Sequence, residues 1–185
     1  MIRIACSVRR SFLFPADLPT ACAYFSDVTR AIGRLPHIRL VNTYAPNHFR
    51  MLYHASELGI YRIRLYCDVQ AQFDAKRRIL RVTPLNGHLP VKARVTLSSL
   101  TAQATYASES VFQPAGGHTR VDYHLSLRAT VPKLLGLQLV PDSVLERIAH
   151  TTAMWRIHEI ADGLIERSIR EFERGRRRGR KRSTE

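Results

Sequence analysis

The sequence predicts an α+β fold, in which a curved antiparallel sheet of about seven strands packs with two short helices and a long C-terminal helix. Residues 118–131 alternate apolar and polar side chains, which is typical of a strand with one buried face. Between residues 144 and 172, apolar residues recur every three or four positions and indicate a helix of about eight turns. The apolar stripe on this helix drifts around its axis, so we expect its partner surface to be curved.

The first strand is predicted over residues 2–14, where apolar and polar side chains alternate. Arg10 interrupts the pattern, because it falls on the apolar face of this strand. A cation inside a protein needs an ion pair or an anionic ligand group, since an isolated buried charge is costly. Arg10 therefore either points inward to such a partner or is turned to solvent by a bulge or strand end.

Two short helices follow this strand. Asp17 can cap the first of them, and apolar residues at helical spacing continue to residue 28. The second helix is expected over residues 29–35 and should end around Gly33 and Pro36.

The middle of the chain reads as successive strands separated by turn signals. The predicted strands are 37–45, 48–57, 60–73, 77–83, a poorly defined piece near 91–98, 100–113 and 118–131. The sequence has no helix pattern between these strands, so the sheet should be an antiparallel meander. The long helix should then begin near Pro141, with Asp142 or Ser143 as its cap.

We expect one domain, residues 1–173, followed by a disordered Arg-rich tail, residues 174–185. The formal net charge is +14, and arginine outnumbers lysine 25 to 4. The tail concentrates this charge in Arg174, Arg176, Arg177, Arg178, Arg180, Lys181 and Arg182. Such a run can contact nucleic-acid phosphates or an anionic membrane surface, and it can equally serve as a solubilising end without a partner.

The order of the elements resembles the helix-grip fold of the START-like superfamily (SRPBCC), which includes birch-pollen-allergen proteins, polyketide cyclases and lipid-transfer domains. The resemblance covers residues 2–172. It is closer to an uncharacterised branch, a domain of unknown function, in which a proline-flanked segment such as residues 131–141 precedes the last helix. That branch has no established catalytic set. The resemblance implies a cavity between the sheet and the C-terminal helix that holds an apolar ligand.

Inward-facing residues of the predicted strands and helix would line that cavity. The candidate ligand-binding residues are Arg10, Tyr61, Ile63, Leu65, Cys67, Tyr123, Leu125, Ile148 and Thr152. Tyr61, Tyr123 and Thr152 supply hydroxyl groups that a ligand could satisfy. The alternative is that the same residues form a solid core without a cavity.

The first functional prediction is binding, with transport as an extension of it, of an apolar or amphipathic small molecule or lipid. One alternative is a polyketide cyclase or aromatase-like enzyme that uses the same cavity. Another is a nucleic-acid or protein adaptor that acts through its basic surface. The sequence contains no catalytic, nucleotide-binding or metal-binding motif, so no catalytic residue, metal or cofactor is predicted. No signal sequence is recognised at the N-terminus, and we expect a cytoplasmic protein, with peripheral membrane contact as a variant of this location.

Overall fold

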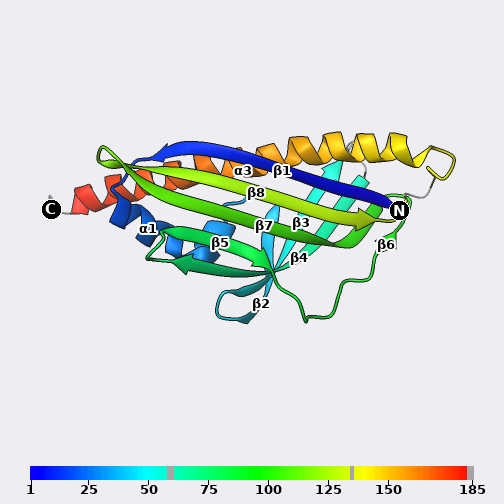
Figure 1. Ribbon diagram of the computed structural model, residues 1–185, viewed down its shortest axis with the longest axis horizontal. Coiled ribbons are helices and arrows are strands. Elements are labelled where there is room, and N and C mark those ends of the chain that lie inside the picture. Colours follow the sequence, from blue (N-terminus) through cyan, green and yellow to red (C-terminus); the bar gives the residue numbers. More distant parts are fainter. Residues whose placement is uncertain (58–60, 134–135, 183–185) are drawn as a thin grey trace.

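The structure is a computed structural model that describes residues 1–57, 61–133 and 136–182 (Figure 1). The elements are β1 (Ile2–Phe14), α1 (Leu18–Ser26), α2 (Val28–Ile32), β2 (Ile38–Ala45), β3 (His48–Glu57), β4 (Tyr61–Asp74), β5 (Ile79–Pro84), β6 (Arg94–Val95), β7 (Ser99–Ala115), β8 (His118–Val131) and α3 (Asp142–Arg182). This order confirms the predicted α+β class, with a long C-terminal helix after a series of strands. The turn expected between the predicted strands 48–57 and 60–73 lies outside the described residues.

The strands form one curved sheet in the order β1-β8-β7-β5-β4-β3-β2, with β6 paired to β7. β1 and β8 pair antiparallel along their whole length, from Ile2 opposite Val131 to Phe14 opposite Thr119. The sheet departs from a simple meander at one place, because residues 62–66 of β4 pair in parallel with β7. The chain leaves β5 through a long connection rather than a tight turn, and this connection lets β7 return beside both β5 and β4.

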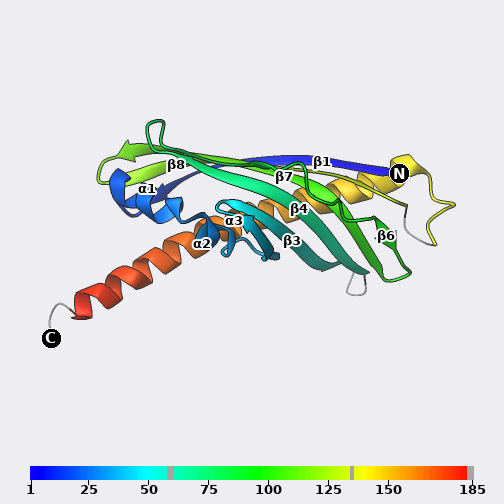
Figure 2. The ribbon, with the colours of Figure 1, turned by 90° about the horizontal axis from the view of Figure 1, so that it is seen from below.

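The two short helices begin at aspartate caps. The side chain of Asp17 accepts a hydrogen bond from the backbone N–H of Thr20 at 3.1 Å, as predicted. Asp27 caps α2 in the same way, through the backbone N–H of Arg30 at 3.0 Å. These caps satisfy backbone donors that a helix start leaves without partners. They also fix where α1 and α2 lie over one end of the inner face of the sheet (Figure 2).

The long helix α3 packs mainly against β1 and runs along the inner side of the sheet (Figures 1 and 2). Its buried residues are Leu145, Ile157, Ile160, Ala161 and Ser168. Apolar side chains from β1, β4, β7 and β8 meet this face and the helices α1 and α2 in one continuous core.

The helix continues through Arg182, whereas the sequence predicts a disordered tail from residue 174 onward. Arginine and lysine have high intrinsic helix propensity, so a helix anchored upstream can extend without apolar packing. Residues 174–178 are exposed, and this end extends beyond the sheet in Figure 2. The side chains of Arg180, Lys181 and Arg182 lie outside the described part of the chain. No helix in the described ranges is both long and apolar enough to cross a membrane.

Deletion of residues 174–185 is expected to leave the melting temperature of the protein almost unchanged. The described contact from this segment to the body is an exposed hydrogen bond from Arg176 to the backbone oxygen of Pro15, at 3.3 Å. Such an exposed contact contributes little to the free energy of unfolding. Thermal unfolding followed by circular dichroism checks this. A large fall in melting temperature would show that the extension is docked on the body.

Candidate functional site

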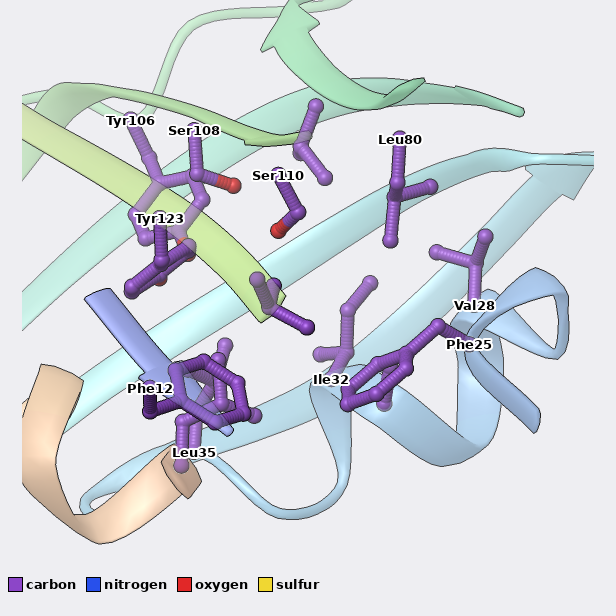
Figure 3. Close-up of a pocket in the computed structure, with 14 residues that line it drawn as sticks. Phe12, Phe25, Val28, Ile32, Leu35, Leu80, Tyr106, Ser108, Ser110 and Tyr123 are labelled. Atoms are coloured by element: carbon purple, nitrogen blue, oxygen red, sulfur yellow. The ribbon is translucent and has the colours of Figure 1, made fainter. Parts of the chain in front are cut away.

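A small cavity lies between the sheet, the two short helices and the middle of α3 (Figure 3). Its volume is about 40 Å³. It is lined by Phe12, Phe25, Val28, Ala31, Ile32, Leu35, Leu80, Val82, Tyr106, Ser108, Ser110, Val121, Tyr123 and Leu164. The space is enough for a few water-sized spheres and far below the roughly 300 Å³ of an ordinary ligand pocket. The structure therefore shows the site in a nearly filled form.

One wall of the cavity carries hydroxyl groups. Tyr106, Ser108 and Ser110 alternate along the inner face of β7, and Tyr123 lies opposite Ser110 on β8. The hydroxyl oxygens of Tyr106 and Tyr123 are 3.3 Å apart, and both tyrosines are buried. Figure 3 shows these four side chains together on the same side of the cavity.

Burial determines the charge state of this wall. It raises the pKa of Tyr106, partly offset by a hydrogen bond with Ser108. It also raises the pKa of Tyr123 well above the ordinary value of 10.0, and the neighbouring Tyr106 raises it further. Both phenols are therefore neutral at physiological pH and offer O–H donors and oxygen acceptors.

The facing wall is apolar and comes from β1, α1, α2 and the turn after α2. The Phe25 ring contacts Phe14 at 5.1 Å and Phe112 at 5.4 Å between centroids. Val28, Ala31 and Ile32 follow on the inner side of α2, and Figure 3 shows Phe25, Val28 and Ile32 across the cavity from the sheet. None of the described residues that line this cavity is an Asp, Glu, His, Lys or Arg.

Residues 33–37, which connect α2 to β2 and which we call the α2–β2 connection, close the cavity against α3. Leu35 of this connection and Leu164 of α3 both line the cavity. Pro36 packs so closely on Gly163 that a Cβ added to this glycine would lie 2.3 Å from the Pro36 Cγ. A glycine in the middle of a helix costs stability, and here it allows α3 to approach the connection closely.

Three polar contacts join the α2–β2 connection to α3 on either side of this close approach. His37 Nε2 lies 3.1 Å from the carboxylate of Glu159. Nε of Arg34 donates to Glu171 at 2.6 Å, and Arg167 donates to the backbone oxygen of Arg34 at 3.4 Å. Any widening of the cavity on this side has to stretch or break these contacts.

Arg10 points inward, which is the first of the two alternatives that the sequence leaves open. It forms an ion pair with a carboxylate of α3. Its Nε donates to Asp162 at 2.6 Å, and one terminal nitrogen donates to the same carboxylate at 3.2 Å. That nitrogen also lies 2.6 Å from Nδ1 of His158. The register of β1 against β8 continues through Arg10 without a bulge. The cation thus meets a protein carboxylate, and it does not line the cavity.

The ion-paired carboxylates of α3 allow a prediction of how the stability of the protein depends on pH. A hydrogen bond from Arg10 lowers the pKa of Asp162, and one from Arg34 lowers that of Glu171. A carboxylate with a lowered pKa stabilises the fold above its unfolded pKa, and this contribution is lost as pH falls through the folded pKa. We expect the melting temperature to fall as pH drops below the ordinary values of 4.5 for Glu and 3.8 for Asp. Thermal unfolding of wild type and Asp162→Asn from neutral to acid pH checks this, because the variant should lose less stability. Equal losses would contradict it.

Apart from Arg10, the predicted ligand-binding residues fall into four groups. Tyr123 lines the cavity. Leu65, Cys67 and Leu125 are buried in the core, and Tyr61, Ile63 and Thr152 are partly buried. Ile148 is 58% exposed, so the prediction that it faces the sheet is wrong. Val144 and Trp155 of α3 are exposed as well, so the apolar residues of this helix extend beyond its buried face.

The sequence predictions placed the cavity too far toward the start of β4. The cavity lies near β5 and under α1 and α2, and several lining residues come from these elements. A usable signal was present in β7, where Ser108 and Ser110 fall on the inward face between Tyr106 and Phe112. Two serines on a buried strand face are unusual and mark a polar wall.

Comparisons with known proteins place this site in a known fold. No protein-family model and no curated protein sequence matches the chain. Among solved structures, the Zhui aromatase/cyclase from Streptomyces sp. R1128 is 12% identical with a TM-score of 0.55, over 92% of this chain and 94% of that one. The protein DR_A0006 from Deinococcus radiodurans is 18% identical with a TM-score of 0.55, over 92% and 98%. A START superfamily protein from Mycobacterium smegmatis is 12% identical with a TM-score of 0.46, over 90% and 98%.

These likenesses show a shared fold. The chain has the helix-grip fold, as the sequence resemblance predicted. At such low identity, no residue role passes from these structures to this chain.

Proposed function

We propose that this protein binds an apolar small molecule or lipid in the cavity between β7, β8, the short helices and α3. The observation that carries the proposal is an apolar space, closed by α3, with four hydroxyl groups on one wall. Small-molecule sites combine an apolar lining with a few placed polar groups in this way. The structural neighbours include an aromatase/cyclase and a START superfamily protein, which supports a ligand-binding role for the fold.

Binding requires the cavity to expand, because its present volume of about 40 Å³ is too small for a lipid. The α2–β2 connection is the side on which this can happen. It is held to α3 by polar contacts and by the packing of Pro36 on Gly163, whereas β7 and β8 are fixed by their hydrogen-bonded ladder. A ligand that binds the open form would shift the population toward it.

Binding without catalysis is favoured over a cyclase-like reaction by the chemistry of the lining. General acid–base catalysis needs a group whose pKa lies near the working pH. The lining has no carboxylate or imidazole, and burial raises the pKa of Tyr106 and Tyr123. The cavity can orient a substrate through hydroxyl groups, but it offers no base for proton removal.

Mass spectrometry of freshly purified protein tests the proposal. Under native conditions we expect a fraction of the protein to carry a small apolar molecule, which organic extraction releases for identification. The variant Ser110→Leu, which fills the cavity from β7, should lose this molecule. A matched control is Ser7→Leu on the outer face of β1, which should retain it. Wild-type protein without a co-purified molecule, and without a thermal shift on addition of apolar compounds, would contradict the proposal.

A second proposal concerns the basic end of α3, which we infer contacts an anionic membrane surface from which an apolar ligand could be taken up. Arg174, Arg176, Arg177 and Arg178 are exposed there. The attraction between such cations and anionic lipids decreases with salt. Cosedimentation with vesicles of neutral or anionic phospholipid tests this for the full chain and for residues 1–173. The full chain should bind only anionic vesicles at low salt. Equal binding by both proteins would contradict a role of the basic end.

A further inference from the structure

The lining of the cavity specifies the charge and polarity of its ligand. We propose that the ligand is a neutral, largely apolar molecule with a hydroxyl or carbonyl oxygen that bonds to Tyr106 and Tyr123, and not a carboxylate, phosphate or amine. The inference rests on the proposed function, because it names the ligand class of the same cavity.

The first argument is the absence of a counter-charge among the lining residues. Among the residues that the structure describes, no charged side chain lines the cavity, and the inward-pointing Arg10 of β1 is already bonded to Asp162. A carboxylate or ammonium group in this space would lose its hydration without gaining an ion pair. An isolated charge without a counter-charge is costly to bury, so charged ligands are excluded on energetic grounds.

The second argument is the hydrogen-bonding capacity of the tyrosine pair. Each neutral phenol has one O–H donor, and two hydroxyl groups that bond to each other use only one of their two donors. The distance of 3.3 Å between the Tyr106 and Tyr123 oxygens exceeds the usual 2.5 to 3.0 Å for an O–H···O bond. This weak contact can be exchanged for bonds to a ligand oxygen placed between the two phenols.

The third argument is the arrangement of the two walls. The hydroxyl groups lie on β7 and β8, whereas Phe12, Phe25 and Ile32 face them across the cavity (Figure 3). A molecule with its oxygen toward the tyrosines would place its apolar body against these rings and aliphatic side chains. The wall thus fixes the orientation of the ligand as well as its charge.

Calorimetric titration of the full chain with four naphthalene compounds near neutral pH separates polarity from charge. The compounds are naphthalene, 2-naphthol, 2-naphthoate and the methyl ester of 2-naphthoate. We expect 2-naphthol and the methyl ester to bind about 10-fold more tightly than naphthalene, as one hydrogen bond provides. The naphthoate anion, which differs from its ester mainly in charge, should show no measurable binding.

Tyr106→Phe and Tyr123→Phe should each reduce the affinity for 2-naphthol about 10-fold and leave that for naphthalene unchanged. Tyr66→Phe is the matched control, because Tyr66 lies on the outer face of β4. Circular dichroism verifies folding, and Ser108→Ala is a smaller change at the same wall if a tyrosine variant does not fold.

The possible results separate this inference from the proposed function. Equal affinities for naphthalene and 2-naphthol, or binding of the naphthoate anion as tight as that of its ester, would overturn the inference while leaving an apolar binding site. Unchanged 2-naphthol affinity in Tyr106→Phe, Tyr123→Phe and Ser108→Ala would also overturn it. If no compound binds and the purified protein carries no molecule, the proposed function itself fails.

Discussion

Substitution of Gly163 by alanine is expected to lower the free energy of unfolding by about 1 to 3 kcal/mol, the usual range for overpacking. The new Cβ would lie 2.3 Å from Cγ and 3.1 Å from Cδ of Pro36, and the proline ring cannot rotate away. Alanine is otherwise favoured over glycine inside a helix by about 1 kcal/mol. A net loss of stability therefore reports the steric contact. Thermal and denaturant unfolding measure it.

Two further variants isolate that contact. Gly175→Ala introduces the same methyl group in the same helix, with no atom within 4 Å, and should be neutral or slightly stabilising. Pro36→Ala in the Gly163→Ala background should recover part of the lost stability, because it removes the ring that the methyl group meets. If Gly163→Ala is as stable as Gly175→Ala, α3 does not need its close approach to the α2–β2 connection.

The same substitution bears on access to the cavity. Leu164, the next residue along α3, lines the cavity, and Leu35 lines it from the connection beside Pro36. A methyl group that pushes α3 away from Pro36 would separate these two leucines. We therefore expect faster exchange of a bound apolar compound in Gly163→Ala than in Gly175→Ala.

The strand and helix pattern of this fold could be predicted from the sequence because its periodicities are local. The alternation at 118–131 matches β8 residue for residue. The end of α3 could not be predicted in this way. Apolar content ends near Phe172, but helix propensity does not.

The position of the site could not be predicted because it depends on contacts between distant segments. Leu65 and Cys67 were candidate ligand-binding residues because apolar and polar side chains alternate regularly along β4. Both are buried inside the core. The sequence does not say which third of a long curved strand lies under α1 and α2. Arg10 is a second case: the alternation left its inward orientation as one of two alternatives, and its partner Asp162 is 152 positions away in the sequence.

The buried guanidinium of Arg34 leads to the second large expected effect. Arg34 is 5% exposed, and its Nε donates to Glu171 at 2.6 Å. Its two terminal nitrogens are buried without a hydrogen-bond partner among the described residues, and its Cζ lies 4.4 Å from the centre of the Tyr24 ring. The ring face attracts the cation, but it does not replace the carboxylate. Glu171 is therefore the group that makes burial of this charge tolerable.

Glu171→Ala is expected to cost about 2 to 3 kcal/mol, below the full range for breaking a buried ion pair because the carboxylate is 41% exposed. Denaturant unfolding measures the loss, and Glu173→Ala, an exposed glutamate on the same helix, is the matched control. The double variant Arg34→Met with Glu171→Ala also removes the cation. It should restore much of the stability, because no charge is then buried without a partner. If the double variant is no more stable than Glu171→Ala, the loss arises from the exposed pair of Glu171 with Arg30, at 2.8 Å, and not from the buried Arg34.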